Sequence, residues 1–506
     1  MKDKPNEAWE VTGVDTLSKA RDLNNTRTDP EIPTIIKNSE NHPRTTAEHI
    51  ILTGTTDLTS VASLPATHMA KYASLAIINT NLQIEKEADL KPTFEKLYSY
   101  VLDYSSSREF KEKVNEVNLN SKSQAEALSS KVINNTDTAI LNKEEKEAKN
   151  LYEAIKENYH KLPESSRSKT PEQYLEKILF DKIKMKALED TIISDLEPKL
   201  VKESENQGFK KLTEHSKDRT TYCFYGAPAS GKGTSVAMRR KEAIEQGKNW
   251  SDIVKINTDS HRDFIIDDRL TTSKIENKSP LNHAEAGFIS NMSYRLYEKK
   301  VNDNKAPDML VDTIMPNQYI LDMAVKNGGK ALIDVISIPA EKCVERAYER
   351  GKEEGRLVPR EYNINANINV PKNFHDIMSK YTGKNIEYKI VDNDVERGKK
   401  PILIEQGNLK EKKVEIHDKT RLDEFLRKQN LNPKAQNPQE LYSEDYSQKT
   451  PTYKFNDSNL GIKVSYTKVS DEAQMIKEQL RTRSTSDGLT DSNKNVTVKK
   501  NNQIGR

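Results

Sequence analysis

The sequence is short of cysteine and of long apolar runs, and each shortage excludes a class of protein. Two cysteines among 506 residues cannot form a disulfide framework, so a reducing cytosol is the expected compartment. With a mean hydropathy of −0.85, no run approaches the roughly 18 apolar residues of a membrane-spanning helix. The N-terminal residues MKDKPNEAWEV lack the apolar core of a secretory signal. We therefore expect a cytoplasmic protein with no membrane span.

An excess of charge of either sign is also missing. The 81 basic and 78 acidic side chains leave a net charge of +3, so nothing in the composition demands a polyanionic partner. The length predicts about two to four domains. From the composition along the chain we expect four parts: a flexible lead-in at 1–45, a helical domain at 46–215, an α/β domain at 216–425, and a polar, mostly disordered tail at 426–506.

Two local features support this division. Pro171 opens a long helical pattern that runs through Leu200, and Thr170 is placed to cap it. Cys223 lies in an apolar run and Cys343 in a helical pattern, and we expect both to be buried without a chemical role.

Short apolar runs alternate with helical patterns between about residues 218 and 410. The runs predict strands at Thr220–Tyr225, Ile253–Asn257, Met309–Asp312, Ala331–Ile338 and Tyr388–Asp392, with a further candidate at 461–466. The alternation predicts the α/β class, with a parallel sheet covered by helices on both faces, preceded by the helical domain and followed by the tail. In such sheets, ligands bind beyond the carboxyl ends of the strands.

The first of these strands leads into a glycine-rich loop. Residues 221–234 read TYCFYGAPASGKGT, with Gly226 and Gly231-Lys232 at Walker A spacing and a helical pattern afterwards. Such a loop wraps backbone N–H groups around a phosphate, and its lysine reaches the β- and γ-phosphates. The alternative is an ordinary glycine turn between a strand and a helix. We assign nucleotide binding to the whole loop: Gly226, Ala227, Pro228, Ala229, Ser230, Gly231, Lys232, Gly233 and Thr234.

Two positions depart from the commonest form of this loop. Ala229 stands where many such loops have glycine, and Gly233 stands where a hydroxyl residue usually binds Mg²⁺. Thr234 follows one position later and is expected to face the α-phosphate. Mg²⁺ would then be held by nucleotide oxygens, water and a distant carboxylate. We expect ATP or GTP as the nucleotide, with Mg²⁺.

An aspartate follows the second predicted strand. Asp259 would face the γ-phosphate across the mouth of the sheet, where a general base takes a proton from an attacking hydroxyl. Arg262, three residues later, would bind substrate or phosphate. The alternative is that Asp259 only caps the next helix. We expect His261 to be a surface neighbour and not a catalyst.

The third predicted strand ends in a second aspartate. Asp312 stands at the Walker B-like position, where a carboxylate orients Mg²⁺ through water or binds substrate, and Thr313 places a hydroxyl beside it. The alternative is a cap for the helix that begins near Pro316.

A basic helix and a glycine-containing segment follow the fourth predicted strand. Arg346 and Arg350 lie four residues apart and share a helix face, and Arg356 lies in a segment that Gly351, Gly355 and Pro359 would make mobile. Arginines on such a lid supply positive charge to a transferring phosphoryl group. The alternative is a solvated helix on which neighbouring glutamates pair with the arginines.

These motifs, in this order, resemble the zeta-toxin kinases and their relatives, the 5′-polynucleotide kinases. GAPASGKGT is similar to their phosphate loop, INTDSHR to their base segment, VDTIMP to their strand end, and ERAYERG with GRLVP to their lid. The resemblance covers about residues 218–410 and implies a P-loop kinase in which Lys232 contacts the nucleotide phosphates. It also implies Asp259 as the base, and arginines on the phosphates: Arg346, Arg350 and Arg356.

The resemblance extends to the acceptor. The segment His283-Ala-Glu285 resembles a helix that lines the acceptor pocket of zeta toxins, which implies that Glu285 binds substrate together with Arg262, Asp312 and Thr313. The departures at Ala229, at Gly233 and after Thr313 affect Mg²⁺ placement and acceptor identity more than phosphoryl transfer itself.

Three functions fit these observations. The first is a kinase that moves the γ-phosphate of ATP or GTP to a hydroxyl of a small molecule such as a nucleotide-sugar. The second is a 5′-hydroxyl polynucleotide kinase, which would need a basic, aromatic-bearing channel for nucleic acid. The third is a nucleotide-binding scaffold without transfer activity, whose helical domain binds a protein partner. The large, lysine- and asparagine-rich chain also resembles bacterial effectors, which would move its site of action to a host cell.

Overall fold

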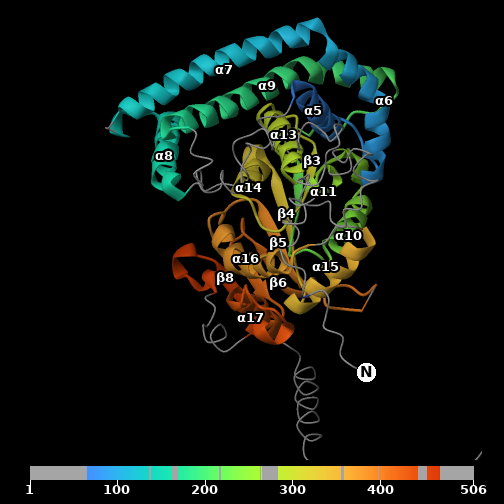
Figure 1. Ribbon diagram of the computed structural model, residues 1–506. Coiled ribbons are helices and arrows are strands. Elements are labelled where there is room, and N and C mark those ends of the chain that lie inside the picture. The colour runs from blue at the N-terminus through green and yellow to red at the C-terminus, as the bar shows by residue number, and fades with distance from the viewer. Residues whose placement is uncertain are drawn as a thin grey trace, which may run out of the picture.

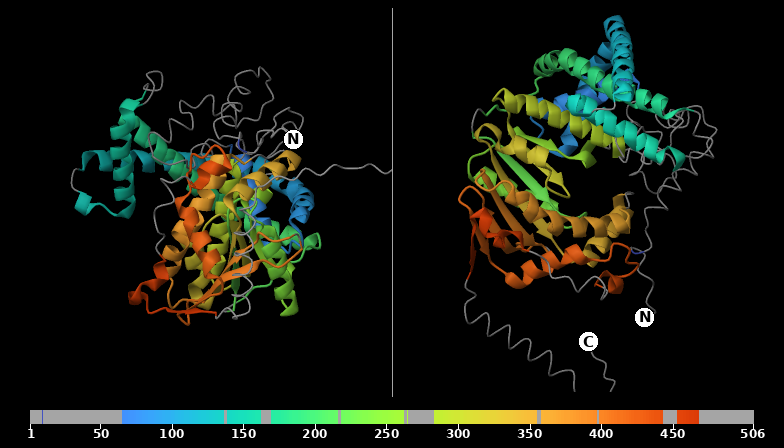
Figure 2. Two further views of the ribbon diagram at one scale, coloured as in Figure 1. Left: turned by 90° about the horizontal axis from the view of Figure 1, so that it is seen from below. Right: turned by 90° about the vertical axis from the view of Figure 1, so that its left-hand side faces the viewer.

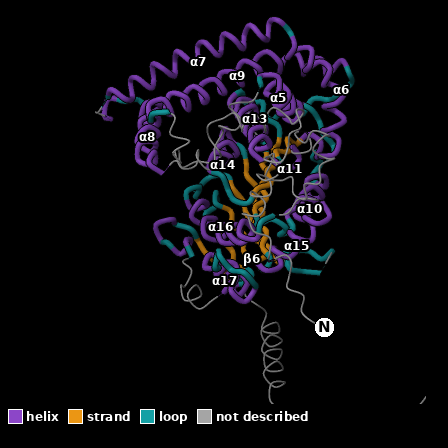
Figure 3. The backbone as a smooth tube through the Cα atoms, viewed as in Figure 1, coloured by secondary structure: helices purple, strands orange, loops and turns teal. Residues whose placement is uncertain are grey.

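The computed structural model describes Trp9 and most of the chain from residue 65 to 467. The described ranges are 65–135, 138–161, 169–215, 218–261, 264, 283–354, 358–396, 398–442 and 453–467. The rest of the lead-in expected at 1–45, and the final residues expected to be disordered, lie outside them. Figure 1 shows a sheet between two layers of helices, with further helices along one side, and Figure 3 shows the same arrangement by secondary structure.

The sheet has eight strands in the order β2-β3-β1-β4-β5-β6-β7-β8. The first five in that order are parallel, β6 is antiparallel to β5 and to β7, and β8 runs parallel to β7. Their bounds are β1 Thr220–Tyr225, β2 Ile253–Ile256, β3 Asp308–Thr313, β4 Lys330–Ser337, β5 Ile386–Asp392, β6 Ile402–Asn408, β7 Lys413–Ile416 and β8 Lys463–Tyr466. The five strands predicted in the α/β segment are confirmed, and the candidate at 461–466 is β8.

Helices cover both faces of this sheet, as the alternation of the sequence predicts. One face carries α10, and the other carries α13, α14, α16 and α17 (Figure 1). Side chains of β1 alternate between them: Tyr222 and Phe224 pack toward α10, while Cys223 and Tyr225 pack toward the second layer. The bounds are α10 Lys232–Glu245, α11 Thr258–His261, α13 His283–Asn302, α14 Gln318–Val325, α15 Ala340–Glu354, α16 Arg360–Ser379 and α17 Lys419–Arg427.

The helical region before the sheet consists of α5 Ala66–Asn81, α6 Glu87–Ser106, α7 Arg108–Asn134, α8 Lys143–Asn158 and α9 Pro171–Asn206. Thr170 caps α9 as predicted, because its side chain accepts a hydrogen bond from the Gln173 N–H. The N-terminal half of α9 packs with α7 and α8, whereas its C-terminal half packs with α5, α6 and α13. Figures 1 and 2 show α7 and α9 running side by side along the edge of the molecule.

The helical region contacts the sheet at the β2 edge. Asn79 Nδ2 of α5 donates to the Lys255 carbonyl of β2 at 2.8 Å, and Lys255 Nζ donates to the Ile84 carbonyl at 3.0 Å. Arg295 of α13 forms an ion pair with Glu189 of α9 at 2.6 Å. The apolar side chains of α13 between these contacts are buried by α5 and α9. The two parts therefore share one core.

Residues after 425 also belong to the folded body. The boundary expected at 425 falls inside α17, and Lys428 Nζ just after it donates to Ser337 Oγ at 2.6 Å. Tyr453 donates its hydroxyl hydrogen to Glu405 Oε2 at 2.7 Å, and Phe455 is buried in the main core. Because Tyr453 contacts β6 and β8 pairs with β7, the ordered structure extends further than the composition indicates.

Candidate active site

The loop between β1 and α10 is held tightly against the sheet. Gly226 approaches the β4 backbone so closely that a Cβ there would lie 2.5 Å from the Ile336 carbonyl oxygen. Ala229 and Gly231 both have positive φ, at 63° and 95°, and the helix begins directly after Gly231. This conformation brings the loop to the N-terminus of α10, where the first backbone N–H groups have no partner within the helix. The loop is therefore shaped to bind an anion.

Lys232 lies at the centre of this loop. Its Nζ donates to the carbonyl oxygens of Gly226 at 2.9 Å and Ala227 at 3.3 Å, and lies 3.7 Å from Asp312 Oδ1. Only 15% of the lysine side chain and 25% of the aspartate side chain are exposed. The structure thus brings together the predicted loop lysine and the predicted carboxylate of β3, which are eighty residues apart in the chain.

Two asparagines that the sequence motifs did not reveal donate hydrogen bonds to backbone carbonyls of the loop. Asn393 directly follows β5 and donates from Nδ2 to the Ser230 carbonyl at 3.1 Å. Asn363 of α16 donates to the Cys343 carbonyl at 3.0 Å and reaches the Pro228 carbonyl at 3.4 Å. Both asparagines are buried. The position of Asn393 at the carboxyl end of a parallel strand is the signal that could have identified it.

The hydroxyl of Ser230 is the clearest unused polar group in the loop. It is buried, and among the described residues it has no hydrogen-bond partner. A buried hydroxyl without a partner costs free energy unless a ligand or water completes it. Thr234, in the first turn of α10, is exposed, and its backbone N–H donates to the Gly231 carbonyl at 3.0 Å. The donors that remain in the loop suit phosphate oxygens.

Asp259 lies at the same edge of the sheet, two strands from the loop. Ile256 of β2 is opposite Val311 of β3, which is opposite Cys223 of β1. Because neighbouring strands are about 4.8 Å apart, the strand ends that lead to Asp259 and to the loop are about 10 Å apart. Asp312 lies on the strand between them. Asp259 is exposed at this edge of the sheet.

Neither aspartate acts as the helix cap that was the alternative for it. The backbone N–H of Asp259 donates to Asn257 Oδ1 at 2.9 Å, so the asparagine is the capping residue of α11. The helix after β3 is capped by Asn317, whose side chain accepts from the Tyr319 N–H, and Asp312 stays within the strand. Thr313, the last residue of β3, donates its hydroxyl hydrogen to the Met315 carbonyl at 3.0 Å.

His261 is buried, so the expectation that it lies on the surface is wrong. Its Nδ1 lies 3.2 Å from Ser290 Oγ of α13, and Ser290 Oγ also lies 3.1 Å from Thr258 Oγ1. Burial lowers the pKa of His261 to about 4, although a hydrogen bond to the Ala286 backbone opposes the shift. A neutral imidazole held against α13 supports the short helix that carries Asp259. Sequence reasoning missed this because Ser290 is far away in the chain.

The lid residues are placed only in part. Arg346 of α15 lies 3.7 Å from Asp394 Oδ1, next to the Asn393 that supports the loop, and Arg350 lies one turn further along the same helix, exposed. Lys342 pairs with the same Asp394 at 2.7 Å. Arg356 and Arg262 lie outside the described residues. Glu285 lies in the first turn of α13, but its side chain is outside what the structure describes.

Cys343 lies on α15 and packs in a buried apolar cluster with Ala227 of the loop. Burial raises its thiol pKa, although the positive charges of Lys428, Lys232 and Arg346 act in the opposite direction. Both cysteines of the chain are buried, as expected. A thiol that stays protonated in this position packs against Asn367 and does not act as a nucleophile.

A metal site made by the protein alone is not found in the described part of the chain. No group of three or more His, Cys, Asp or Glu side chains there is arranged to hold a metal ion. The donor set near Lys232 contains one carboxylate, Asp312, and the following loop position is Gly233, which has no hydroxyl. This set fits Mg²⁺ only if nucleotide oxygens and water supply most of the ligands.

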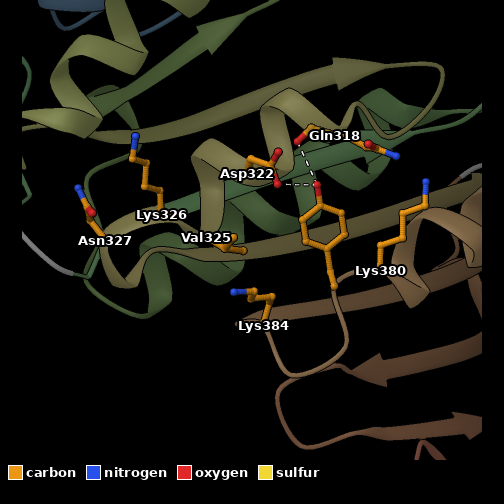
Figure 4. A pocket seen from close by; sticks show the side chains of 8 residues that line it. Gln318, Asp322, Val325, Lys326, Asn327, Lys380 and Lys384 are labelled. Atoms are coloured by element: carbon orange, nitrogen blue, oxygen red, sulfur yellow. Dashed lines mark hydrogen bonds between the residues drawn. The ribbon is translucent and has the colours of Figure 1, made fainter. Parts of the chain in front are cut away.

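A cavity lies away from this site. It has a volume of about 570 Å³ and lies between the C-terminal parts of α14 and α16, near the amino ends of β4 and β5 (Figure 4). Tyr381 in its wall donates its hydroxyl hydrogen to Asp322 Oδ1 at 2.8 Å, and exposed lysines surround the opening: Lys326, Lys380 and Lys384. The phosphate loop is at the opposite ends of these strands, so this cavity is not part of the candidate active site.

The sheet order, the loop and its lysine define the class of this segment as a P-loop kinase-type α/β domain. Residues 205–408 match the family model described as Zeta toxin. This segment is therefore similar to the zeta toxin family, as the motif resemblance predicts. None of the curated proteins matches the sequence. Among the described helices, no stretch combines the length and the apolar character needed to cross a bilayer.

Several solved structures show weak similarity. A complex of AvrRxo1-ORF1 with AvrRxo1-ORF2 and sulphate ions matches at 15% identity and a TM-score of 0.35, over 43% of this chain and 65% of that one, which is less than two thirds of its length. The same complex with ATP gives the same values. The PezAT toxin–antitoxin system of Streptococcus pneumoniae matches at 16% identity and a TM-score of 0.29, over 38% of this chain and 75% of that one. Similarities this weak carry no argument about activity.

Proposed function

We propose that this protein transfers the γ-phosphate of ATP or GTP to a hydroxyl of a small molecule such as a nucleotide-sugar. The observation that carries the proposal is the Lys232–Asp312 contact of 3.7 Å at the edge of the sheet where Asp259 follows β2. A loop that only bound nucleotide would need the lysine but not an exposed carboxylate two strands away. The match of residues 205–408 to the zeta toxin family supports a kinase-type reaction.

In the proposed reaction, Lys232 and the N–H groups at the start of α10 bind the β- and γ-phosphates. The acceptor oxygen attacks the γ-phosphorus, the bond from that phosphorus to the bridging oxygen breaks, and the nucleoside diphosphate leaves. Asp259 takes the proton of the acceptor hydroxyl. Arg346 and Arg350 of α15, with Arg356, stabilise the charge on the transferring group.

Asp312 would hold Mg²⁺ through water, together with the nucleotide oxygens. When bound, the ion supplies neutralisation of the phosphate charge. Thr313, Arg262 and Glu285 complete the proposed acceptor side. We further propose that the helical region before residue 205 offers the surface for a protein partner, since it lies beside α13 and outside the matched segment.

Two substitutions test this proposal. In Asp259→Asn, nucleotide binding should persist while transfer falls by about 10²–10⁴-fold, because the acceptor loses its base. In Lys232→Ala, nucleotide binding should weaken by about 10-fold or more, because charge-assisted hydrogen bonds to phosphate are lost. Binding is measured with a fluorescent ATP analogue, and transfer with labelled ATP and a metabolite extract.

Asp303→Asn is the matched control, since Asp303 is an exposed aspartate in the turn after α13 and away from the loop. It should match the wild type in both measurements. Transfer that is unchanged in Asp259→Asn would remove Asp259 from the role of base. Nucleotide binding that is unchanged in Lys232→Ala would contradict the assignment of the phosphate loop.

A further inference from the structure

Trp9 is buried in the folded body, although it lies in the segment expected to be a flexible lead-in. Only 4% of it is exposed, and it packs in an apolar cluster with residues from α15, α16 and the segment after α17. We call this cluster the Trp9 socket. It consists of Ala340, Val344, Ile364, Leu431, Ala435 and Leu441. The socket therefore joins the start of the chain to helix α15, more than three hundred residues away.

The Trp9 socket contains one face of α15, the helix that carries Arg346 and Arg350. Ala340 and Val344 are one turn apart, and Tyr348, a turn further, packs against the same cluster, so these positions form one face of α15. Arg346 and Arg350 each follow a member of this face by two residues, which on a helix turns them about 200° away from it. Contact with Trp9 on one face therefore positions the arginines on the other.

A polar contact fixes the same junction. Arg360, the first residue of α16, is 2% exposed and donates from its guanidinium group to the Trp9 carbonyl oxygen. Among the described residues, Glu361 pairs with Arg360 at a distance of 3.7 Å. The N–H groups of a buried guanidinium need hydrogen-bond acceptors, and the Trp9 carbonyl oxygen supplies one of them to Arg360. Trp9 is thus bound through both its ring and its backbone.

The face of α15 that carries Arg346 is linked to the phosphate loop through Asp394 and its neighbour Asn393. Arg346 lies 3.7 Å from Asp394, and the adjacent Asn393 donates to the Ser230 carbonyl of the loop. One turn earlier on α15, Asn363 links the Cys343 carbonyl to the Pro228 carbonyl. A displacement of α15 would therefore move both the arginines and the supports of the loop.

From these contacts we propose that Trp9 is a positioning residue for the kinase site, acting through α15. Docking of Trp9 sets the place of Arg346 and Arg350 relative to the phosphate loop, so that a residue far from the loop in the sequence controls nucleotide affinity. This inference rests on the proposed function, since it requires that the loop binds a nucleoside triphosphate.

The docking of Trp9 in its socket is tested by fluorescence, without a measurement of enzyme activity. The chain has two tryptophans, Trp9 and Trp250, so the emission of Trp250→Phe comes from Trp9 alone. A buried indole should emit at short wavelength and resist acrylamide quenching. As a check that does not depend on folding of that variant, the spectrum of Trp9→Phe is subtracted from that of the wild type. Emission typical of an exposed indole in both experiments would overturn the inference.

The effect on the site is tested by ATP affinity in the full-length protein. Trp9→Ala should weaken binding of a fluorescent ATP analogue by about tenfold, since misplaced arginines lose charge-assisted contacts to phosphate. Trp9→Phe should stay within about twofold of the wild type, because the ring still fills the socket and Nε1 has no partner among the described residues. Rescue by phenylalanine separates positioning from a specific role of the indole N–H.

Phe110→Ala is the matched control, because it also truncates a buried aromatic ring but in α7, away from the socket. It should lower the melting temperature comparably and leave ATP affinity unchanged. Equal ATP affinity in the wild type and Trp9→Ala would overturn this inference and leave the proposed function standing. A wild-type protein that binds neither ATP nor GTP would overturn the proposed function, and this inference with it.

Discussion

Ala229 is the residue in the phosphate loop whose backbone is strained. Its φ of 63° lies in the left-handed region, which costs a residue with a Cβ about 1–2 kcal/mol. Ala229→Gly removes this cost but makes the unfolded chain more flexible, which offsets part of the gain. We expect the free energy of unfolding to rise by up to about 1 kcal/mol in urea denaturation. A variant less stable than the wild type would show that the loop does not need this conformation.

The positions of single residues could be predicted from the sequence where a local pattern determines them. Lys232 and Asp312 could be placed from the glycine spacing and the strand end, and the structure brings them within 3.7 Å. The burial of His261 could not be predicted, because it depends on Ser290 of α13. Nor could the burial of Trp9, because its socket is formed by residues from the second half of the chain.

At the scale of elements, the packing of α11 on α13 makes stability depend on pH. The folded-state pKa of His261 is about 4, below the ordinary value of 6.5, because burial disfavours the charged ring. The unfolded chain then binds more protons than the folded chain between these values. The contribution of His261 to stability is therefore complete above pH 6.5 and is lost as the pH falls through 4, by about 3 kcal/mol in total.

His261→Gln removes this titration, so its free energy of unfolding should fall less than that of the wild type between pH 7 and pH 4.5. The comparison uses urea denaturation of both proteins at both pH values. Other groups titrate in the same range, but they are common to the two proteins and cancel in the difference. Identical losses in the two proteins would mean that His261 is not held neutral against α13.

The elements themselves differ in how well the sequence predicts them. Strands β1 to β4 read as short, largely apolar runs, because helices cover both faces of the sheet there, whereas β5 alternates buried and half-buried residues. β6 and β7 were missed, because their antiparallel segments, ILIEQGN and KVEI, are short and mix apolar with polar residues. Their place in the sheet depends on α17 and on residues after 442, which a local pattern does not contain.

At the scale of the whole molecule, the zeta-toxin-like segment is not a self-contained unit. The face of α13 opposite the sheet carries four buried apolar side chains that pack against α5, α6 and α9: Phe288, Ile289, Met292 and Leu296. Phe264, close to the Asp259 helix, packs against Phe94 of α6 in the same cluster, with ring centroids 5.6 Å apart. The helical region thus completes the core around α13 and the short helix that carries Asp259.

A fragment of residues 216–425 should therefore fail to fold cooperatively. It exposes the four side chains of α13, each worth about 1.5–3 kcal/mol when buried, and the sum is comparable to the roughly 5–15 kcal/mol stability of a whole domain. It also loses Lys428, Tyr453 and Phe455 from the other end of the sheet.

Near-ultraviolet circular dichroism and thermal melting measure the folding of the fragment directly, with a fragment of residues 1–467 as the control that keeps every described contact. The control should show one sharp transition, whereas the short fragment should show a broad one or precipitate. A short fragment that melts sharply and binds ATP would mean that α5 and α9 are an addition to the kinase domain and not a part of its core.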